Sequence, residues 1–214
     1  MYYPHIAMLK TKCLFLVVVM HCVMFFATPF PFWKLYADSP QPLADLITAI
    51  SGTTLIQSFM MASGFLFAAA WDSGKRTPLQ HLLHRGRRLL LPWFGVGMLW
   101  VAPLYWLFSI PAFGHPADTS LVDTWKSVAL GLFTDHLWFL LVLFWVTVFW
   151  IAALGVLKKC GHDTAVAGGM VALVAALCVQ NYGQWIKWYC LWEVPAYILC
   201  YYLGIVVFRN RDAL

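Results

Sequence analysis

The sequence predicts an all-α, polytopic membrane protein, and three observations lead to this prediction. First, hydrophobic residues make up 62% of the 214-residue chain and charged residues only 11%, whereas soluble domains have about 25% charged residues. Second, the hydrophobic residues form six runs, each close to the length of about 20 residues that crosses a bilayer as a helix. Third, the basic residues gather in the connections between these runs, as in membrane proteins of fixed orientation.

The six predicted spans follow one another along the whole chain. They are expected at about residues 13–32, 50–71, 89–109, 136–157, 164–180 and 190–208. Lys10 and Lys12 before the first run imitate the start of a signal peptide. Because five further hydrophobic runs follow, we expect the first run to be retained as a span. The bundle should then form a single domain over residues 1–214.

Local signals support the individual elements. The proline-rich, aromatic residues 29–33 end the first span. Small residues at 62–64 and 165–172 give spans two and five faces on which another helix can pack closely. Pro92 lies in the first turns of span three, where a missing N–H donor is tolerated. Residues 121–133, between spans three and four, are expected to form a short helix at the membrane interface.

The basic residues divide unequally between the two sides of the predicted bundle. Three of the 14 lysines and arginines fall on one side, and the other eleven fall on the opposite side. The three are Lys34, Lys126 and Lys187. Because the side richer in lysine and arginine stays in the cytoplasm, both termini are expected to be cytoplasmic.

Charge and cysteine content exclude several classes of protein. The net charge of +5 at pH 7 does not indicate a nucleic-acid partner, because the positive residues sit in short clusters between hydrophobic runs. The six cysteines form no CxxC pair and no His/Cys cluster at zinc-ligand spacing. Most of them fall inside predicted spans, where cysteine acts as a small apolar residue. We therefore expect neither a metal site nor a disulfide framework.

The most informative polar residue is His21, in the middle of the first hydrophobic run. An ionisable side chain at that depth is costly and indicates a functional site. Lys10 lies eleven residues earlier, and on an α-helix this step returns both side chains to one face, about 16 Å apart along the axis. His21 could be a general base for a hydroxyl nucleophile, because the imidazole pKa is near neutrality. The structural alternative is a neutral imidazole that donates to a carbonyl of a neighbouring helix.

A second group of candidates lies at the cytoplasmic start of span three, where residues 84–88 read His-Arg-Gly-Arg-Arg. Arg85 and Arg88 are three residues apart and are therefore neighbours on one helix face. They could anchor the cytoplasmic end of the span. They could also clamp a phosphate, because guanidinium groups match phosphate oxygens in bidentate fashion.

Three further candidates lie at the outer ends of later spans. Asp135 and His136 stand at the start of span four, and Glu193 lies one turn into span six. They could cap the helix starts or mark the interface. They could instead contact an acceptor substrate on the outer side.

Four segments together resemble the acyltransferase 3 family of integral-membrane acyltransferases. Lys10 and His21 match its pattern of a basic residue, ten residues and a histidine in the first span. Residues 59–67 (FMMASGFLF) resemble its second span, and residues 85–92 (RGRRLLLP) resemble its RxxR segment with the proline-bearing entry to span three. Residues 136–140 (HLWFL) are similar to a further span, and the likeness covers about residues 5–208.

The resemblance implies an enzyme of the bacterial inner membrane. Members move an acyl group, often acetyl or succinyl, from cytoplasmic acyl-coenzyme A to a hydroxyl of a cell-envelope glycan or lipid-linked sugar. By this likeness His21 is the catalytic histidine, and Lys10, Arg85 and Arg88 bind the donor. Acyl-coenzyme A is a substrate, and no permanently bound cofactor or metal is implied.

This sequence departs from the family pattern in two ways. Members carry more spans than the six predicted here, so we expect the C-terminal spans of the family to be absent. A homo-oligomer is one way in which such a chain could complete its site. The aspartate that commonly precedes the basic residue of the first span is also absent, and His5 and Ile6 occupy that neighbourhood.

Three other interpretations stay open. The chain could be a non-catalytic membrane protein, truncated or transporter-like, in which His21 is structural. It could bind haem through His21 and His136, although their different depths disfavour axial ligation. It could be an intramembrane serine protease using Ser63, although residues 61–64 lack the first glycine of a GxSG turn.

Overall fold

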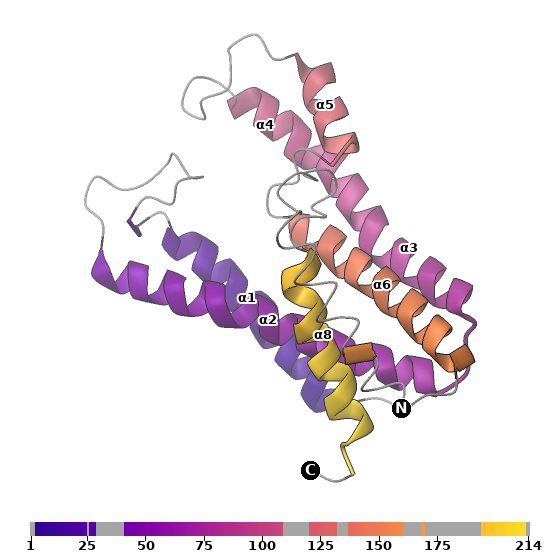
Figure 1. The fold of residues 1–214 in the computed structure, drawn as a ribbon. Helices are drawn as coiled ribbons and strands as arrows, with labels where there is room; N and C mark the ends of the chain where they lie inside the picture. The colour runs from indigo at the N-terminus through magenta and orange to yellow at the C-terminus, as the bar shows by residue number, and fades with distance from the viewer. Residues whose placement is uncertain are drawn as a thin grey trace.

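The computed structural model describes residues 3–24, 26–28, 41–108, 120–131, 137–160, 168–169 and 194–212. Every regular element in these ranges is helical (Figure 1), which confirms the predicted all-α class. Among the described residues, three helices are long and hydrophobic enough to cross a membrane. They are α1 (Pro4–Met24), α2 (Pro42–Asp72) and, over Trp138–Gly155, α6 (Trp138–Cys160).

The helices α1 and α2 form an antiparallel pair, and each begins earlier than hydrophobicity alone predicts. Helix α1 starts at Pro4 and α2 at Pro42, because a proline suits the first turn of a helix. The hydroxyl of Thr28, just beyond α1, donates to the Asp45 carboxylate at 2.6 Å. The backbone N–H of Thr28 donates to the same group. These bonds tie the end of α1 to the first turn of α2.

The predicted third span is a composite of three helical pieces. These are α3 (Pro78–Val96), the π-helix η1 (Gly97–Val101) and α4 (Ala102–Phe108). Thr77 and Gln80 start α3 with a capping box, in which each side chain accepts from the backbone N–H of the other, at 3.3 and 2.9 Å.

The short helix predicted between spans three and four is present as α5 (Leu121–Ala129), with Ser120 at its N-cap. Its Trp125 indole donates to the Met98 carbonyl of η1 at 3.0 Å. A π-helix alters the regular pattern of backbone hydrogen bonds, and here the indole takes up one of its carbonyls. The bond holds α5 beside the composite third span.

The last helix, α8 (Val194–Arg209), crosses α2 at a contact between two glycines. A Cβ atom on Gly64 would collide with the Tyr201 carbonyl, and one on Gly204 would collide with the Met61 carbonyl. This close approach confirms that the small residues of the second predicted span form a packing face. The fifth predicted span lies outside the described residues, apart from 168–169.

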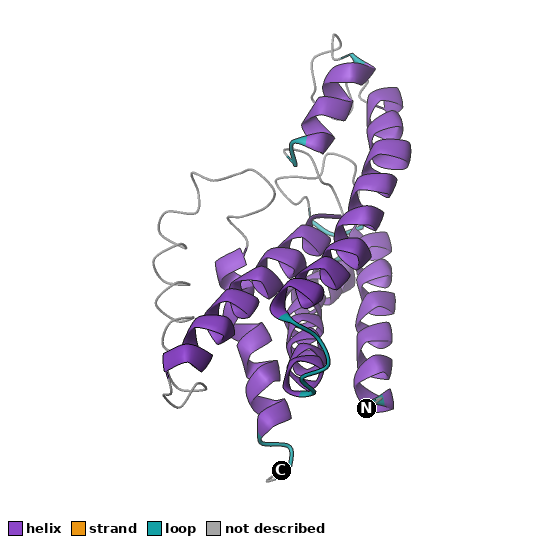
Figure 2. Cartoon of the chain, turned by 90° about the vertical axis from the view of Figure 1, so that its right-hand side faces the viewer, coloured by secondary structure: helices purple, strands orange, loops and turns teal. Residues whose placement is uncertain are grey.

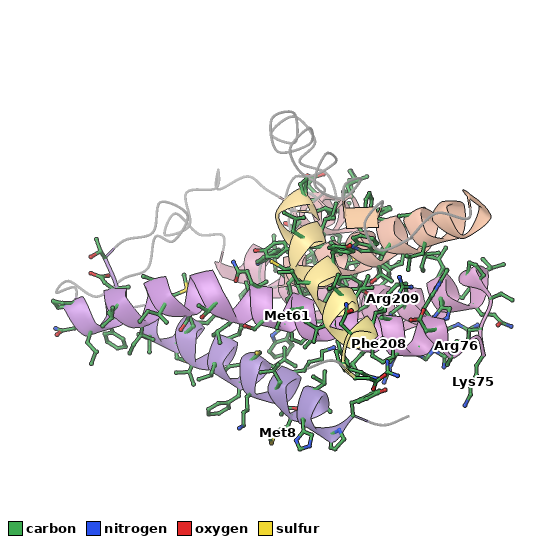
Figure 3. The ribbon with its side chains drawn as sticks, turned by 60° about the horizontal axis from the view of Figure 1, so that its bottom comes forward. Met8, Met61, Lys75, Arg76, Phe208 and Arg209 are labelled. Carbon is green, nitrogen blue, oxygen red and sulfur yellow. The ribbon has the colours of Figure 1, made fainter. Side chains whose placement is uncertain are left out.

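Two groups of helices make up the bundle. Helices α1, α2 and α8 pack together, α3 packs along α6, and α6 also meets α8 (Figures 1 and 2). Both termini lie at one end, and α4 and α5 lie at the other (Figure 1). At the terminal end Arg209 donates twice to Asp72, each bond 3.2 Å long, near Lys75 and Arg76 (Figure 3).

Candidate functional site

Lys10 lies on α1, near the end of the bundle that carries the termini. Its half-buried side chain places Nζ 4.5 Å from the centroid of the Phe59 ring on α2. Such a cation–π contact contributes about 0.5–2 kcal/mol, depending on burial. Phe59 meets Phe139 of α6 edge-on, with ring centroids 6.0 Å apart. The ammonium group therefore lies against one aromatic ring of α2, and that ring in turn packs on α6.

Arg85 and Arg88 of α3 lie close enough to Lys10 for both of their charges to act on it. Arg85 is half-buried and Arg88 is exposed. Within the described part of the chain, no carboxylate forms an ion pair with any of these three residues. Unscreened positive groups repel one another, and an anion bound between them would remove that repulsion. We name Lys10, Arg85 and Arg88 the basic triad.

A buried pair of hydroxyls lies within electrostatic range of Arg85, one member of the basic triad. Tyr201 of α8 and Thr147 of α6 are both fully buried, and their oxygens are 3.2 Å apart. Thr147 uses its one proton to donate to the Leu143 carbonyl at 2.8 Å, so Tyr201 must donate to Thr147. The Tyr201 oxygen then has a lone pair to offer, and the charge of Arg85 acts on this residue. The pair places an acceptor near the half-buried arginine.

His21 lies on α1 together with Lys10, as the sequence predicts. One helix carries both residues without a break, so the step of eleven residues puts them on one face, about 16 Å apart along the axis. The His21 Nδ1 atom is 2.7 Å from the Val17 carbonyl. A carbonyl can only accept, so Nδ1 carries the proton and the lone pair of a neutral ring is on Nε2. His21 is thus in the tautomer that leaves Nε2 as the basic atom.

The structure places Arg85 and Arg88 within electrostatic range of Lys10, and His21 lies deeper on the same helix face as Lys10. Sequence reasoning missed Phe59, Tyr201 and Thr147. No local pattern could have found the hydroxyl pair, because its members are 54 residues apart in sequence and meet only through helix packing. Phe59 lies in the segment already singled out for its small residues, and its role appears only once α1 is beside it.

The three candidates at the outer side, Asp135, His136 and Glu193, lie outside the described residues and stay predictions. The haem interpretation also depends on His136. Ser63 is fully buried and its hydroxyl donates to the Phe59 carbonyl at 2.8 Å. This hydroxyl is therefore engaged by its own helix, which supports a packing role for Ser63.

Comparison with known protein families gives one match, and it covers almost the whole chain. The acyltransferase domain of the acyltransferase 3 family matches residues 5–214. No curated protein and no solved structure matches the chain. The match includes the helices that carry the basic triad and His21. The chain belongs to the acyltransferase 3 family.

Proposed function

We propose that this protein is a membrane-bound O-acyltransferase. It moves an acyl group of the acetyl or succinyl class from cytoplasmic acyl-coenzyme A to a hydroxyl of a cell-envelope glycan or lipid-linked sugar. The observation that carries the proposal is the arrangement of the basic triad at one end of the bundle, with His21 about 16 Å deeper on the face of α1 that carries Lys10. Family membership supports the acyl-transfer chemistry.

The basic triad is proposed to bind the phosphates of coenzyme A. Two guanidinium groups supply paired N–H donors for phosphate oxygens, and Lys10 adds a point charge. The triad needs an anion to offset its own repulsion. The pantetheine arm of a bound donor would extend from the triad along α1, which brings the thioester toward His21.

His21 is proposed to act as the general base. Its Nε2 lone pair removes the proton from the acceptor hydroxyl, and the hydroxyl oxygen attacks the thioester carbonyl carbon. The carbonyl electron pair moves to oxygen and forms an oxyanion. The oxyanion then collapses and expels coenzyme A thiolate, which takes the proton from the imidazolium. The products are the acyl ester and the free thiol, with His21 restored.

The proposed topology is six spans with both termini in the cytoplasm of a bacterial inner membrane. The shared position of the two termini and the basic cluster around Lys75, Arg76 and Arg209 support it (Figures 1 and 3). It puts the basic triad on the side where coenzyme A is made. Asp135, His136 and Glu193 are proposed to face the acceptor on the outer side.

A second candidate is a non-catalytic membrane protein with a structural histidine. The bond from His21 to Val17 favours it, because a structural histidine satisfies its ring N–H with a backbone carbonyl. In that case the basic triad would anchor the helices at the membrane surface and bind no donor.

Donor binding decides between the two candidates. We expect acetyl-coenzyme A to bind saturably to the detergent-purified protein in a calorimetric titration. Arg88→Ala should weaken binding about 10- to 100-fold, because it removes a charge-assisted hydrogen bond. His21→Ala should bind as wild type does, since His21 lies far from the phosphates.

Arg87→Ala is the matched control for this titration. Arg87 is adjacent to Arg88 and exposed, and its position one and two residues from Arg88 and Arg85 puts it on a different face of α3 from that pair. Its variant should bind within about twofold of wild type if the triad is a specific site. If Arg88→Ala and Arg87→Ala lose affinity for acetyl-coenzyme A equally, or if the folded protein binds no acetyl-coenzyme A, the proposed donor site is refuted.

A further inference from the structure

Thr48 of α2 has an unusual hydroxyl for a helical residue. It is only 4% exposed, and its Oγ1 atom has no hydrogen-bond partner among the described residues. Other hydroxyls in these helices donate to the carbonyl four residues earlier, which is the usual outlet for serine and threonine in a helix. They are Thr11, Thr54, Ser63, Thr124 and Thr147. Thr48 makes no such bond.

Contacts along the α1–α2 pair show which part of α1 lies opposite Thr48. Lys10 lies against Phe59, and at the far end the Gln41 N–H donates to the Phe26 carbonyl at 2.8 Å. Interpolation between these two contacts puts His21 level with about residue 47 of α2. Thr48 is therefore at the depth of His21.

Thr48 also belongs to the face of α2 that α1 covers. The buried residues of this stripe recur at helical spacing and are Ala44, Thr48, Leu55 and Phe59. Helices α1 and α8 pack on α2, but α8 crosses it much further along, at Gly64. At the level of Thr48 the neighbouring described helix is thus α1.

An unpaired buried hydroxyl lowers stability. A hydroxyl of this kind at the depth of His21 can serve a ligand that binds between α1 and α2. A threonine hydroxyl can donate one hydrogen bond and accept two. In the proposed reaction the proton that His21 Nε2 takes from the acceptor hydroxyl is delivered to the leaving thiolate, so the oxyanion needs a separate hydrogen-bond donor. The reaction proposed above requires such a donor.

We propose that Thr48 is a catalytic residue that donates its hydroxyl hydrogen bond to the acyl carbonyl oxygen as this atom becomes an oxyanion. The inference rests on the proposed function, because it assigns the donor for the His21-dependent step. The hydroxyl keeps its proton throughout. Only the strength of the hydrogen bond changes as negative charge develops on the carbonyl oxygen.

Diethyl pyrocarbonate tests this role without coenzyme A or a glycan. The His21 Nε2 atom attacks a carbonyl carbon of the reagent and an oxyanion forms. Ethyl carbonate then leaves with the electron pair, and the Nδ1 proton of the acylated ring passes to it or to water. The same oxyanion donor should therefore act. Peptide mass spectrometry measures the rate of His21 modification in the full-length protein. Thr48→Val should slow it about 100-fold, and Thr48→Ser should restore at least half of the wild-type rate.

Two controls separate this role from a structural one. The exposed His5 on the same helix should react at the same rate in every variant. Thr54→Val removes a hydroxyl that already bonds to the Ile50 carbonyl at 2.6 Å, and it should leave the His21 rate unchanged. The thermal midpoint of Thr48→Val should equal or exceed that of wild type, because the variant removes an unpaired polar group.

The outcomes distinguish this inference from the proposed function. Equal His21 rates in wild type and Thr48→Val would overturn the role of Thr48, whatever the result of the donor titration. If Thr48→Val slows the modification of His21 but the protein binds no acetyl-coenzyme A, Thr48 keeps its role as the hydrogen-bond donor to the oxyanion. The same result would refute acyl-coenzyme A as the acyl donor. If both Thr48 variants slow the modification of His21 and also lower the thermal midpoint, Thr48 has a structural role and the inference is overturned.

Discussion

At the scale of single residues, His81 shows how the basic end of the molecule affects a buried group. Its ring lies 6.0 Å from Phe67 and 5.4 Å from Trp71, between ring centroids. It is buried, and Nε2 has no hydrogen-bond partner in the described part of the chain. Burial lowers the pKa of His81 below its usual value, and the nearby charges of Arg76 and Arg85 lower it further.

This environment predicts a loss of stability in acid. Above about pH 6.5 the ring is neutral in both the folded and the unfolded protein, so it adds no pH dependence. Below that pH the unfolded chain binds the proton first, and the free energy of unfolding falls. His81→Phe keeps a ring between Phe67 and Trp71 but cannot be protonated. Its thermal midpoint should fall less between pH 7.5 and 5.5 than that of wild type; equal falls would contradict this account.

Sequence reasoning could predict residue positions where helix geometry alone decides them. Lys10 and His21 share a face because eleven residues make just over three full turns, and the structure keeps both on one helix. Whether the charge of Arg85 reaches Lys10 depends on how α3 packs, and the Thr147–Tyr201 bond joins helices far apart in sequence. Such contacts follow from tertiary packing, for which a single sequence has no periodic signal.

At the scale of elements, hydrophobic length predicts that helices exist but not where they end. Helix α1 extends nine residues before its predicted start, through Lys10 and Lys12, because polar side chains do not end a helix whose backbone bonds continue. The π-helix inside the third span could not be foreseen. One of its carbonyls, that of Met98, accepts from the Trp125 indole of another helix, and such a contact leaves no local pattern in the sequence. The helix at residues 121–129 could be predicted, since Ser120 is a good N-cap.

The crossing of α2 and α8 predicts an unequal effect of two glycine substitutions. Gly64→Ala places a methyl group against the Tyr201 carbonyl and should destabilise the protein by about 1–3 kcal/mol through overpacking. Gly95→Ala has no atom within 4 Å of the new Cβ and should be neutral or slightly stabilising, since alanine favours helices. Thermal unfolding in detergent measures both. Equal midpoints for the two variants would contradict the close crossing.

At the scale of the whole molecule, the two ends of the bundle differ. One end is basic and has hydrogen bonds between its helices, and the other end carries α4 and α5 (Figure 1). The pair of bonds between Arg209 and Asp72 joins the ends of α8 and α2. Lys75 and Arg76 are exposed in the neighbouring turn, close to Arg209 in Figure 3. This polarity agrees with the lysine and arginine distribution, which could be read from the sequence because it does not depend on packing.

The concentration of basic residues at one end of the bundle predicts how the protein is oriented in the membrane. If the basic triad binds acyl-coenzyme A, the end of the bundle that carries the triad must face the cytoplasm. Trypsin should then cut after Lys75 or Arg76 in inside-out vesicles and spare these sites in spheroplasts. Lys126 of α5 has a side chain 67% exposed at the opposite end, and it should be cut in spheroplasts alone. Mass spectrometry of the membrane fragments identifies each cleavage. Cleavage after Lys75 in intact spheroplasts would reverse the topology and separate the basic triad from its proposed substrate, because coenzyme A is made on the cytoplasmic side.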